Sequence, residues 1–395
     1  MSDDTIRVAL ICFDNPFLKP MEGGKRSMMT RIQSLSRIED ISVDVYLLCK
    51  HSEGKAETFH NVDQRAKFYQ YSMNQTSPVM LLSGLPICVN KRFVKECVEE
   101  LRKHQYDVAI YEGEQVSSYR LKNVVNAKKH ILYFHDIESQ YRKAIADTAE
   151  NYIKRIANLR ESKQFERIEQ RLDTLFDAFW FISKDECAQI KNHVRGECVY
   201  IPAPASELSE KATTGDRSPV MLYVGDLSVT HNYLSLKWFV DEVMPIVKKH
   251  VPFMKCEIVG RVNEENKKAL QNEYVHVLGY VDDLEAIYDD AACIISPVLY
   301  GAGVKIKVID ALGKGQIVIT TSKGVEGTEL ENGKHLLVAD DPEELANICI
   351  DVLKNRVKYT YIAAAGHEFV KKYHSIEHQA DLISSQLSKL CKNIH

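Results

Sequence analysis

The sequence alternates short apolar runs with amphipathic helical patterns from end to end. Apolar runs such as Val43–Cys49 are rich in β-branched residues, and patterns such as Leu236–His250 separate them. A strand that is apolar along its whole length needs cover on both faces, so this alternation predicts parallel sheets flanked by helices. The predicted strands are Val8–Phe13, Val43–Cys49, Val108–Tyr111, Ile131–Phe134, Phe179–Ile182, Val199–Ile201, Val220–Val224, Cys256–Val259, Val275–Leu278, Ala292–Ile295, Ile317–Thr320 and Leu336–Val338. The predicted helices include Lys91–His104, Asn151–Asp173, Leu236–His250 and Glu343–Leu353.

A polar, proline-bearing stretch from Pro202 to Pro219 divides the chain near its middle. After it, VMLYVGDL begins a strand-turn-helix pattern, as IRVALICF does near the N-terminus. A chain of 395 residues is long enough for two domains, each with a core of its own. We therefore predict an α/β protein with two Rossmann-like domains, residues 1–204 and 205–370, whose parallel sheets face a central cleft.

Composition narrows the class of protein. A hydrophobic content of 45% and a charged content of 27% are typical of a soluble globular chain. The net charge of −4 gives no electrostatic preference for nucleic acid. The ten cysteines are scattered without C-x-x-C pairs, which favours buried, reduced thiols over disulfides or a zinc site. With an acidic N-terminus unlike a signal peptide and no apolar stretch of membrane-spanning length, we predict a cytoplasmic protein.

A glycine turn in the second half is the strongest candidate for a binding site. The apolar run Ala291–Ile295 is followed by Gly301-Ala302-Gly303, an amphipathic segment Val304–Leu312 and a second apolar run, Ile317–Thr320. This pattern predicts a βαβ unit with a glycine turn at the carboxyl end of its first strand. Backbone N–H groups and a helix N-terminus at such a position can bind an anion.

Two charged residues next to this turn suit a nucleoside diphosphate. Lys305 supplies a cation for phosphate, and Asp310 supplies a carboxylate that can accept hydrogen bonds from ribose hydroxyls. The plainer interpretation is a turn, a solvated lysine and a helix-surface aspartate, because G-x-G before a helix is common in α/β proteins.

The stretch Ser296–Thr328 resembles the donor-binding signature of retaining GT-B glycosyltransferases of family 4. In one branch that signature is approximately P-x-x-x-G-x-G-V-K-x-K-V-L-E-A, followed by a turn, a strand and E-G. The matching residues are Pro297, Gly301, Gly303, Val304, Lys305, Lys307, Val308, Ala311, Glu326 and Gly327. The run Gly333–Glu343 is similar to the closing part of the family pattern, and Val275–Leu284 is similar to an earlier part.

The resemblance is weaker in the first half. Gly23-Gly24 corresponds to the family's glycine loop, and His135-Asp-Ile-Glu138 is similar to its H-D-x-E motif. By this resemblance the catalytic residues are Lys305 and His135. The residues that bind the donor are Gly23, Gly24, Gly225, Arg261, Gly303, Val304, Lys305 and Asp310. No metal and no cofactor are implied, because the nucleotide-sugar is a substrate. In the resembling fold, a C-terminal helix such as residues 371–395 crosses back to the first domain.

Several of these assignments have alternatives. Gly23-Gly24 can be a loop hinge, His135 a structural strand-end histidine, and Arg261 part of a rim salt bridge. Lys25 or Arg26 could reach the diphosphate in place of a residue of the second domain.

The sequence also departs from the family pattern. Asp310 stands where the family usually has Glu, and Ala302 where another carboxylate is common. Asp226 follows Gly225 where many members carry Arg, and His231-Asn232 stand where a lysine is expected. We therefore expect Lys305 to carry more of the diphosphate's charge.

The resemblance implies a retaining glycosyltransferase of hexosyltransferase type. It would move a sugar from a nucleotide-sugar to a glycan or lipid-linked acceptor in polysaccharide or glycoconjugate biosynthesis. Alternatives are a catalytically degenerate GT-B protein that binds a nucleotide or a partner subunit, and a sugar-nucleotide epimerase. An NAD-dependent dehydrogenase is disfavoured because the first turn lacks G-x-G-x-x-G.

Two segments mix basic and apolar residues, Asn90–Lys95 (NKRFVK) and Tyr152–Arg160 (YIKRIANLR). Docking at the inner face of a membrane, beside a lipid-linked acceptor, needs such a mixture. Ordinary amphipathic core helices show it too, so both interpretations stay open.

Overall fold

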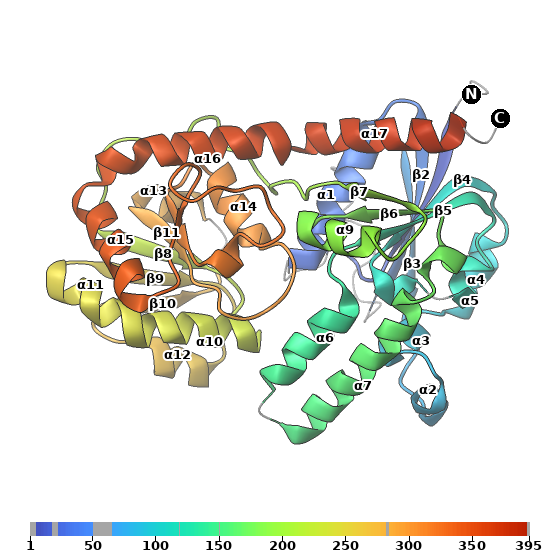
Figure 1. Ribbon diagram of the computed structural model, residues 1–395, viewed down its shortest axis with the longest axis horizontal. Helices are drawn as coiled ribbons and strands as arrows, with labels where there is room; N and C mark the ends of the chain where they lie inside the picture. Colours follow the sequence, from blue (N-terminus) through green and yellow to red (C-terminus); the bar gives the residue numbers. More distant parts are fainter. Residues whose placement is uncertain are drawn as a thin grey trace. The chain divides into compact units, whose positions relative to one another are not determined.

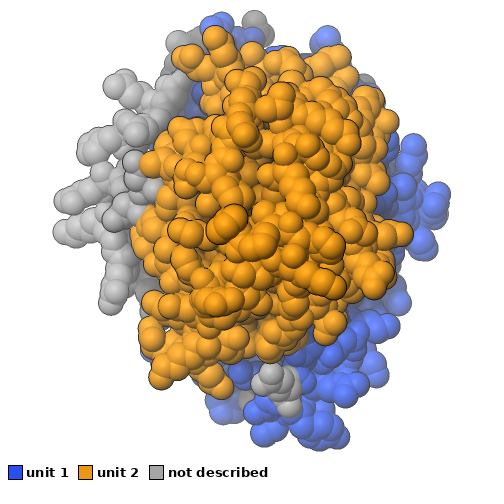
Figure 2. All heavy atoms as spheres, turned by 90° about the vertical axis from the view of Figure 1, so that its left-hand side faces the viewer, with its two compact units in different colours: residues 1–203, 376–395 blue, residues 204–375 orange. Residues whose placement is uncertain are grey.

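The structure is a computed structural model, and it describes residues 5–17, 23–49, 65–117, 119–149, 151–281 and 284–392. The chain divides into two compact units, coloured separately in Figure 2. Unit 1 comprises Met1–Ala203 and Ile376–His395, and unit 2 comprises Pro204–Ser375. Each unit contains its own parallel sheet.

Unit 1 is built on a seven-stranded sheet in the order β3-β2-β1-β4-β5-β6-β7 (Figure 1). All pairings in it are parallel, and the central strands are buried on both faces because Val8 to Cys12 and Val108 to Tyr111 have no exposed surface. The strands are β1 (Ile6–Cys12), β2 (Ile41–Cys49), β3 (Ala66–Ser72), β4 (Tyr106–Glu112), β5 (Ala127–Phe134), β6 (Ala178–Phe181) and β7 (Glu197–Tyr200).

The helices of unit 1 follow its strands, and one returns from the C-terminus. They are α1 (Gly23–Arg37), α2 (Pro78–Leu82), α3 (Ile87–Lys91), α4 (Lys95–Leu101), η2 (Glu114–Val116), α5 (Tyr119–Lys122), α6 (Glu138–Asp147), α7 (Tyr152–Glu169), α8 (Leu172–Leu175), α9 (Lys184–Lys191) and α17 (Ile376–Lys392). Helix α17 packs on α1, where Ser34 Oγ lies 2.9 Å from Gln379 Oε1. Gln379 Nε2 also donates to Pro202 O at 2.8 Å, so this C-terminal helix is fixed to unit 1.

Unit 2 is built on a six-stranded parallel sheet in the order β10-β9-β8-β11-β12-β13. Its strands are β8 (Val220–Val224), β9 (Lys255–Val259), β10 (Val275–Gly279), β11 (Cys293–Ser296), β12 (Val318–Thr320) and β13 (Leu337–Val338). Its helices are α10 (Thr230–Trp238), η3 (Phe239–Val243), α11 (Met244–His250), α12 (Glu264–Leu270), α13 (Glu285–Asp290), α14 (Ile306–Gly313), η4 (Ser322–Gly324), α15 (Pro342–Lys354), η5 (Arg356–Tyr359) and α16 (Thr360–Tyr373).

The strands of the two sheets are connected in the same way. In each sheet the chain adds strands on one side of the first strand and then continues on its other side. In unit 1 the reversal lies between β1 and β4, and in unit 2 between β8 and β11. Open α/β sheets bind ligands outside the carboxyl ends of the strands at such a reversal. Each unit therefore has one edge where a site is expected, near Gly113 in unit 1 and near Gly225 and Pro297 in unit 2.

All twelve predicted strands are present, but the sequence did not predict β3. This strand alternates polar and aromatic residues and is mostly half-exposed at the edge of its sheet, so it lacks an apolar run. The single helix predicted for Lys91–His104 is wrong, because the chain turns at Arg92 between α3 and α4. The guanidinium of Arg92 holds this turn through Phe13 O at 2.8 Å and Cys88 O at 2.9 Å.

Other sequence-level expectations concern cysteines, metals and membranes. The ten cysteines, all within the described ranges, are free thiols. Within the part of the chain that the structure describes, no group of three His, Cys, Asp or Glu side chains is arranged to hold a metal ion. No helix among the described residues has both the length and the apolar character required to cross a membrane.

Candidate functional site

The glycine turn of unit 2 lies between β11 and α14, at the carboxyl end of the sheet. Gly301 has φ +103° and Gly303 has φ +70°, a left-handed backbone that strongly favours glycine. Helix α14 then begins at Ile306, with Lys305 as its N-cap residue. The two glycines are therefore required by the geometry that brings the chain from the strand into the helix.

Lys305, a predicted catalytic and donor-binding residue, lies at this turn with Gly303 and Val304. Its Nζ donates to Ala302 O at 2.9 Å and also to Gly303 O. The ammonium group thus braces the glycine turn in this structure. Its contact with a diphosphate stays a prediction.

Lys307 is a second cation at the turn, and no role was predicted for it from the sequence. Its Nζ lies 3.4 Å from Tyr223 Oη, 3.4 Å from Asn232 Oδ1 and 5.0 Å from the centre of the Tyr223 ring. Burial, reinforced by the positive charge of Lys305, lowers the pKa of Lys307 to about 7. The signal for this residue was present in the sequence, because Lys307 belongs to the G-V-K-x-K match and the family's other cation is missing at 231–232.

His231 completes the group around the turn. A Cβ on Gly301 would lie 3.7 Å from His231 Cδ2, so the imidazole packs against the glycine turn. Burial, followed by the charges of Lys307 and Lys305, lowers the pKa of His231 to about 4. His231 is therefore neutral at physiological pH, and the lysines supply the positive charge.

Gly225 and Arg261, two predicted donor-binding residues, lie at the ends of β8 and β9. A Cβ on Gly225 would lie 2.8 Å from Tyr223 Oη, so this glycine allows close packing beside the ring that Lys307 covers. Arg261 Nη2 is 2.5 Å from Asp226 Oδ2. Although burial acts to raise it, the pKa of Asp226 is held below its usual value by hydrogen bonds from Arg261 and Ser228. The rim salt bridge is thus the arrangement observed for Arg261.

Asp310, the predicted ribose ligand, is on α14 and is not a helix-surface residue, since only 7% of it is exposed. Its Oδ1 accepts from the backbone N–H of Ser206 at 2.8 Å and lies 2.7 Å from Ser206 Oγ. The carboxylate therefore fixes the segment that leads into unit 2. A contact with ribose stays a prediction.

In unit 1, His135 ends the strand run of β5 and lies in a buried polar cluster. Its Nε2 is 2.6 Å from Glu112 Oε2, and Glu112 Oε1 is 3.1 Å from Arg31 Nε. Glu112 and Arg31 have no exposed surface, and 9% of His135 is exposed. His135 was predicted from the sequence, but its partner Glu112 on β4 and the Arg31 of α1 that holds Glu112 were not.

Gly23 and Gly24 are placed at the start of α1, where a glycine loop was expected. A Cβ on Gly24 would lie 3.3 Å from Cζ of Phe13, so this position admits only a small residue without displacement of the ring. Lys25 follows, with its Nζ 3.8 Å from Asp14 Oδ2. Gly24 thus permits close packing of α1 on the residue that follows β1.

Residues 218–355, which lie within unit 2, match the protein-family model described as glycosyl transferases, group 1. This part of unit 2 is thus similar to the group 1 glycosyl transferases. An uncharacterized 44.6 kDa protein in the cps region of Klebsiella pneumoniae is 27% identical to the chain over 379 residues. These residues are 93% of this chain and 96% of the relative.

Solved structures resemble the chain along almost its whole length. Sucrose-phosphate synthase from Thermosynechococcus elongatus has a TM-score of 0.74 at 15% identity, covering 98% of this chain and 99% of that one. HepE of Anabaena, in complex with UDP and glucose, has a TM-score of 0.64 at 12% identity, with coverages of 97% and 99%. Identities this low concern the fold alone. The chain has the two parallel-sheet, Rossmann-like domains of the GT-B fold, as the sequence predicted.

Proposed function

We propose that the protein is a retaining glycosyltransferase of hexosyltransferase type, which transfers a sugar from a nucleotide-sugar to a glycan or lipid-linked acceptor. The match of unit 2 to group 1 glycosyl transferases supports the class of reaction. A role in polysaccharide or glycoconjugate biosynthesis is supported by the relative in the cps region. HepE, which resembles the chain in fold, is a protein whose structure contains UDP and glucose, and this favours a nucleotide-sugar as donor.

The observation that carries the proposal is the pair of lysines at the glycine turn. The interactions that shift the pKa of Lys307 are burial and repulsion from Lys305, and no described carboxylate contributes to raise it. A nucleoside diphosphate at the end of β11 would neutralise both charges and accept hydrogen bonds from the turn. Two lysines thus lie together where open α/β folds bind ligands.

The same site explains how the chemistry could proceed. When the sugar leaves, negative charge accumulates on the diphosphate, and fixed cations stabilise that charge more in the transition state than in the bound donor. The family pattern has basic residues where this chain has Asp226 and His231. Lys307 supplies a cation in their place, while Lys305 holds the turn and adds a second charge. In a retaining reaction of this kind the leaving phosphate itself can take the acceptor's proton, so we expect neither a protein nucleophile nor a metal.

Turnover of a panel of nucleotide-sugars is the test of this proposal. The purified protein should hydrolyse one donor slowly without acceptor and transfer it rapidly when a suitable glycan is added. NMR of the product should show that the anomeric configuration of the donor is retained. Tight binding of a nucleoside diphosphate without turnover would instead support a degenerate binding protein, and isomerisation of the donor without acceptor would support an epimerase.

We also propose that unit 1 contacts a cytoplasmic membrane surface through α2 and the α6–α7 hairpin, which project from the same end of the unit (Figure 1). Tyr152 and Ile153 on α7 are 74% and 77% exposed, and Leu82 on α2 is 88% exposed. The segment Tyr152–Arg160 contains three basic residues and no acidic one, as binding to anionic lipid requires. The other segment, Asn90–Lys95, is excluded from this role, because Asn90, Arg92 and Val94 are buried.

Flotation with lipid vesicles tests the membrane contact. The protein should bind vesicles of phosphatidylglycerol more strongly than vesicles of phosphatidylcholine. The double change Ile153→Ser and Ile156→Ser should reduce that binding several-fold. Phe253→Ser removes an 87% exposed side chain from unit 2 and is the matched control. Equal loss in both variants, or no loss in either, would contradict the assignment.

A further inference from the structure

At its carboxyl end β4 runs into a short acidic segment, Glu112-Gly113-Glu114, which lies beside the end of β5 in the sheet. Glu112 pairs with Tyr133 in the sheet, and Gly113 donates its N–H to Tyr133 O at 2.8 Å. Gly113 has φ +81°, and a Cβ there would meet Phe13 at 3.4 Å. On either side of this turn the two glutamates have different partners. Glu112 contacts side chains, and Glu114 contacts the backbone that follows β5.

Glu112 is held on both of its oxygens. Oε1 accepts from Arg31 Nε at 3.1 Å, and Oε2 lies 2.6 Å from His135 Nε2. The guanidinium of Arg31 also stacks over Tyr133, with Cζ 3.5 Å from the ring centre. One oxygen of this buried carboxylate thus faces a buried guanidinium, and the other is aimed at the imidazole.

The position of the histidine proton follows from this geometry. An ionised carboxylate can only accept hydrogen bonds, so Nε2 of His135 must carry the proton that lies between it and Glu112. In the neutral imidazole, Nδ1 then has an unused lone pair. Nδ1 is buried and has no hydrogen-bond partner among the described residues. The side chain as a whole is 10% exposed.

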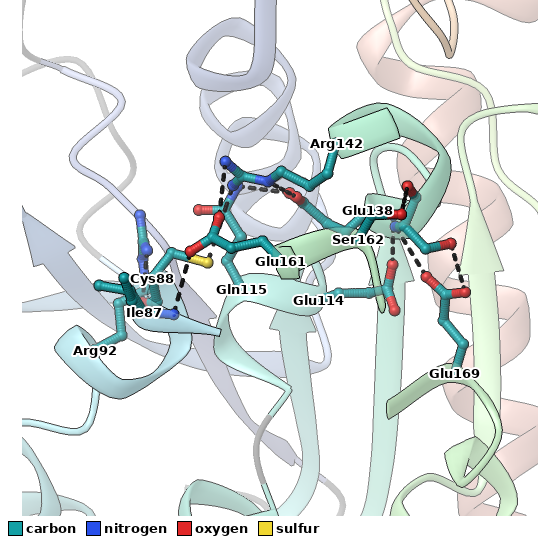
Figure 3. Close-up of polar contacts among 11 residues, drawn as sticks. Ile87, Cys88, Arg92, Glu114, Gln115, Glu138, Arg142, Glu161, Ser162 and Glu169 are labelled. Atoms are coloured by element: carbon teal, nitrogen blue, oxygen red, sulfur yellow. Dashed lines mark hydrogen bonds and ion pairs between the residues drawn. The ribbon is translucent and has the colours of Figure 1, made fainter. Parts of the chain in front are cut away.

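Glutamate side chains also fix the backbone that follows His135 (Figure 3). The N–H of Glu138 donates to Glu114 Oε2 at 2.7 Å, and the N–H of Ser139 donates to Glu169 Oε1 at 3.0 Å. These carboxylates satisfy donors of the first turn of α6 that have no partner within the helix. The ring of His135 and the chain just beyond it are therefore both held by the end of β4.

We propose that Glu112 is a positioning residue for His135. Held by Arg31, it keeps the imidazole in the Nε2–H tautomer and leaves Nδ1 to accept a hydrogen bond from a hydroxyl of the transferred sugar. The proposal rests on the glycosyltransferase activity proposed above. The same arrangement of acid and imidazole sets the tautomer of histidine in hydrolytic enzymes.

The charge and the volume of Glu112 can be tested separately. Glu112→Gln keeps the size of the side chain but removes the charge, and its amide can donate to Nε2 and favour the other tautomer. Glu112→Asp is shorter but keeps the charge. If Glu112 positions His135, kcat should fall about 10²-fold in Glu112→Gln and less in Glu112→Asp, with the KM for the nucleotide-sugar nearly unchanged. A role in packing alone predicts the reverse order.

Nitrogen-15 NMR of the histidine rings supplies a readout that does not depend on turnover. The wild-type signal of His135, assigned by its loss in His135→Gln, should show a protonated Nε2 and an unprotonated Nδ1. Glu112→Gln should shift it toward the other tautomer, whereas Glu169→Gln, which changes a half-buried carboxyl group at the start of α6, should not. An unchanged His135 signal in Glu112→Gln overturns the inference. A wild-type protein that turns over no donor overturns the proposed function instead, and the NMR result still decides the inference.

Discussion

The two sheets share a pattern of strand order, but different charged groups lie at their carboxyl edges. In unit 2 the edge has two lysines and a neutral histidine around a glycine turn, with Lys307 pushed toward neutrality. In unit 1 it has two buried carboxyl groups, of which Glu112 is paired with Arg31 and Glu114 binds the backbone of α6. Under the proposed function these edges are two ligand positions, and side chains decide which ligand each accepts. A positive edge suits a diphosphate, and an edge of internally paired acids suits a neutral, hydroxyl-rich sugar.

The largest effect is expected when positive charge is removed from the carboxyl edge of the unit 2 sheet. Lys307→Ala and Lys305→Ala should each lower kcat/KM by about 10²–10³-fold, because the departing diphosphate loses a fixed cation. Lys334→Ala, which removes an exposed lysine paired with Glu331, is the control and should leave transfer unchanged. Steady-state kinetics with the preferred donor make the measurement. Full activity in both variants would show that neither lysine stabilises the departing diphosphate.

His135→Ala tests the neutral edge of unit 1. Transfer should fall by about 10²-fold, within the usual range for a positioned histidine, while the affinity for the nucleoside diphosphate changes little. The asymmetry is expected because the proposed partner of His135 is the sugar. Calorimetry with the diphosphate, beside kinetics with the donor, separates the two effects. Equal loss of both quantities would return His135 to a structural role.

The pH dependence of nucleotide binding should report the charge of Lys307. Its pKa is lowered to about 7, so the free protein loses this charge as pH rises above about 7. A bound diphosphate favours the charged lysine and raises its pKa, so binding takes up a proton between about pH 7 and the usual lysine value near 10. Affinity should fall up to about tenfold per pH unit in that window, the limit for one linked proton. Calorimetry in buffers of different ionisation enthalpy measures the uptake, and Lys307→Met should abolish it.

The smallest expected effect concerns Asp310, which lies in unit 2 outside the positive group. Asp310→Asn keeps an oxygen for Ser206 but loses its charge, so the free energy of unfolding should fall by about 1 kcal/mol. Denaturant unfolding gives this value, and donor titration shows whether ribose is also affected. A large loss of affinity with unchanged stability would favour the ribose contact, and the reverse would favour the Ser206 contact alone.

Particular elements show where sequence reasoning succeeded. The strands β1, β4, β8 and β11 could be predicted because they are buried on both faces. Such strands are continuous apolar runs, which are easily recognised in a sequence. The glycine turn could be located because Gly301 and Gly303 adopt a backbone that other residues avoid. In contrast, β3 was missed, because a half-exposed edge strand can alternate polar and aromatic residues without an apolar run.

Sequence by itself determined the fold class, the two Rossmann-like domains and the glycine turn beside Lys305, because these depend on local patterns of burial and backbone conformation. Only the tertiary structure decided the partners of the charged groups. Glu112 meets Arg31 from 81 residues away, and Asp310 meets Ser206 from 104 residues away. Charge, burial and the direction of a hydrogen bond depend on residues that are brought together by folding, and no spacing along the chain records them. This is why the sequence indicated Lys305 and His135, while the structure brought forward Lys307 and Glu112.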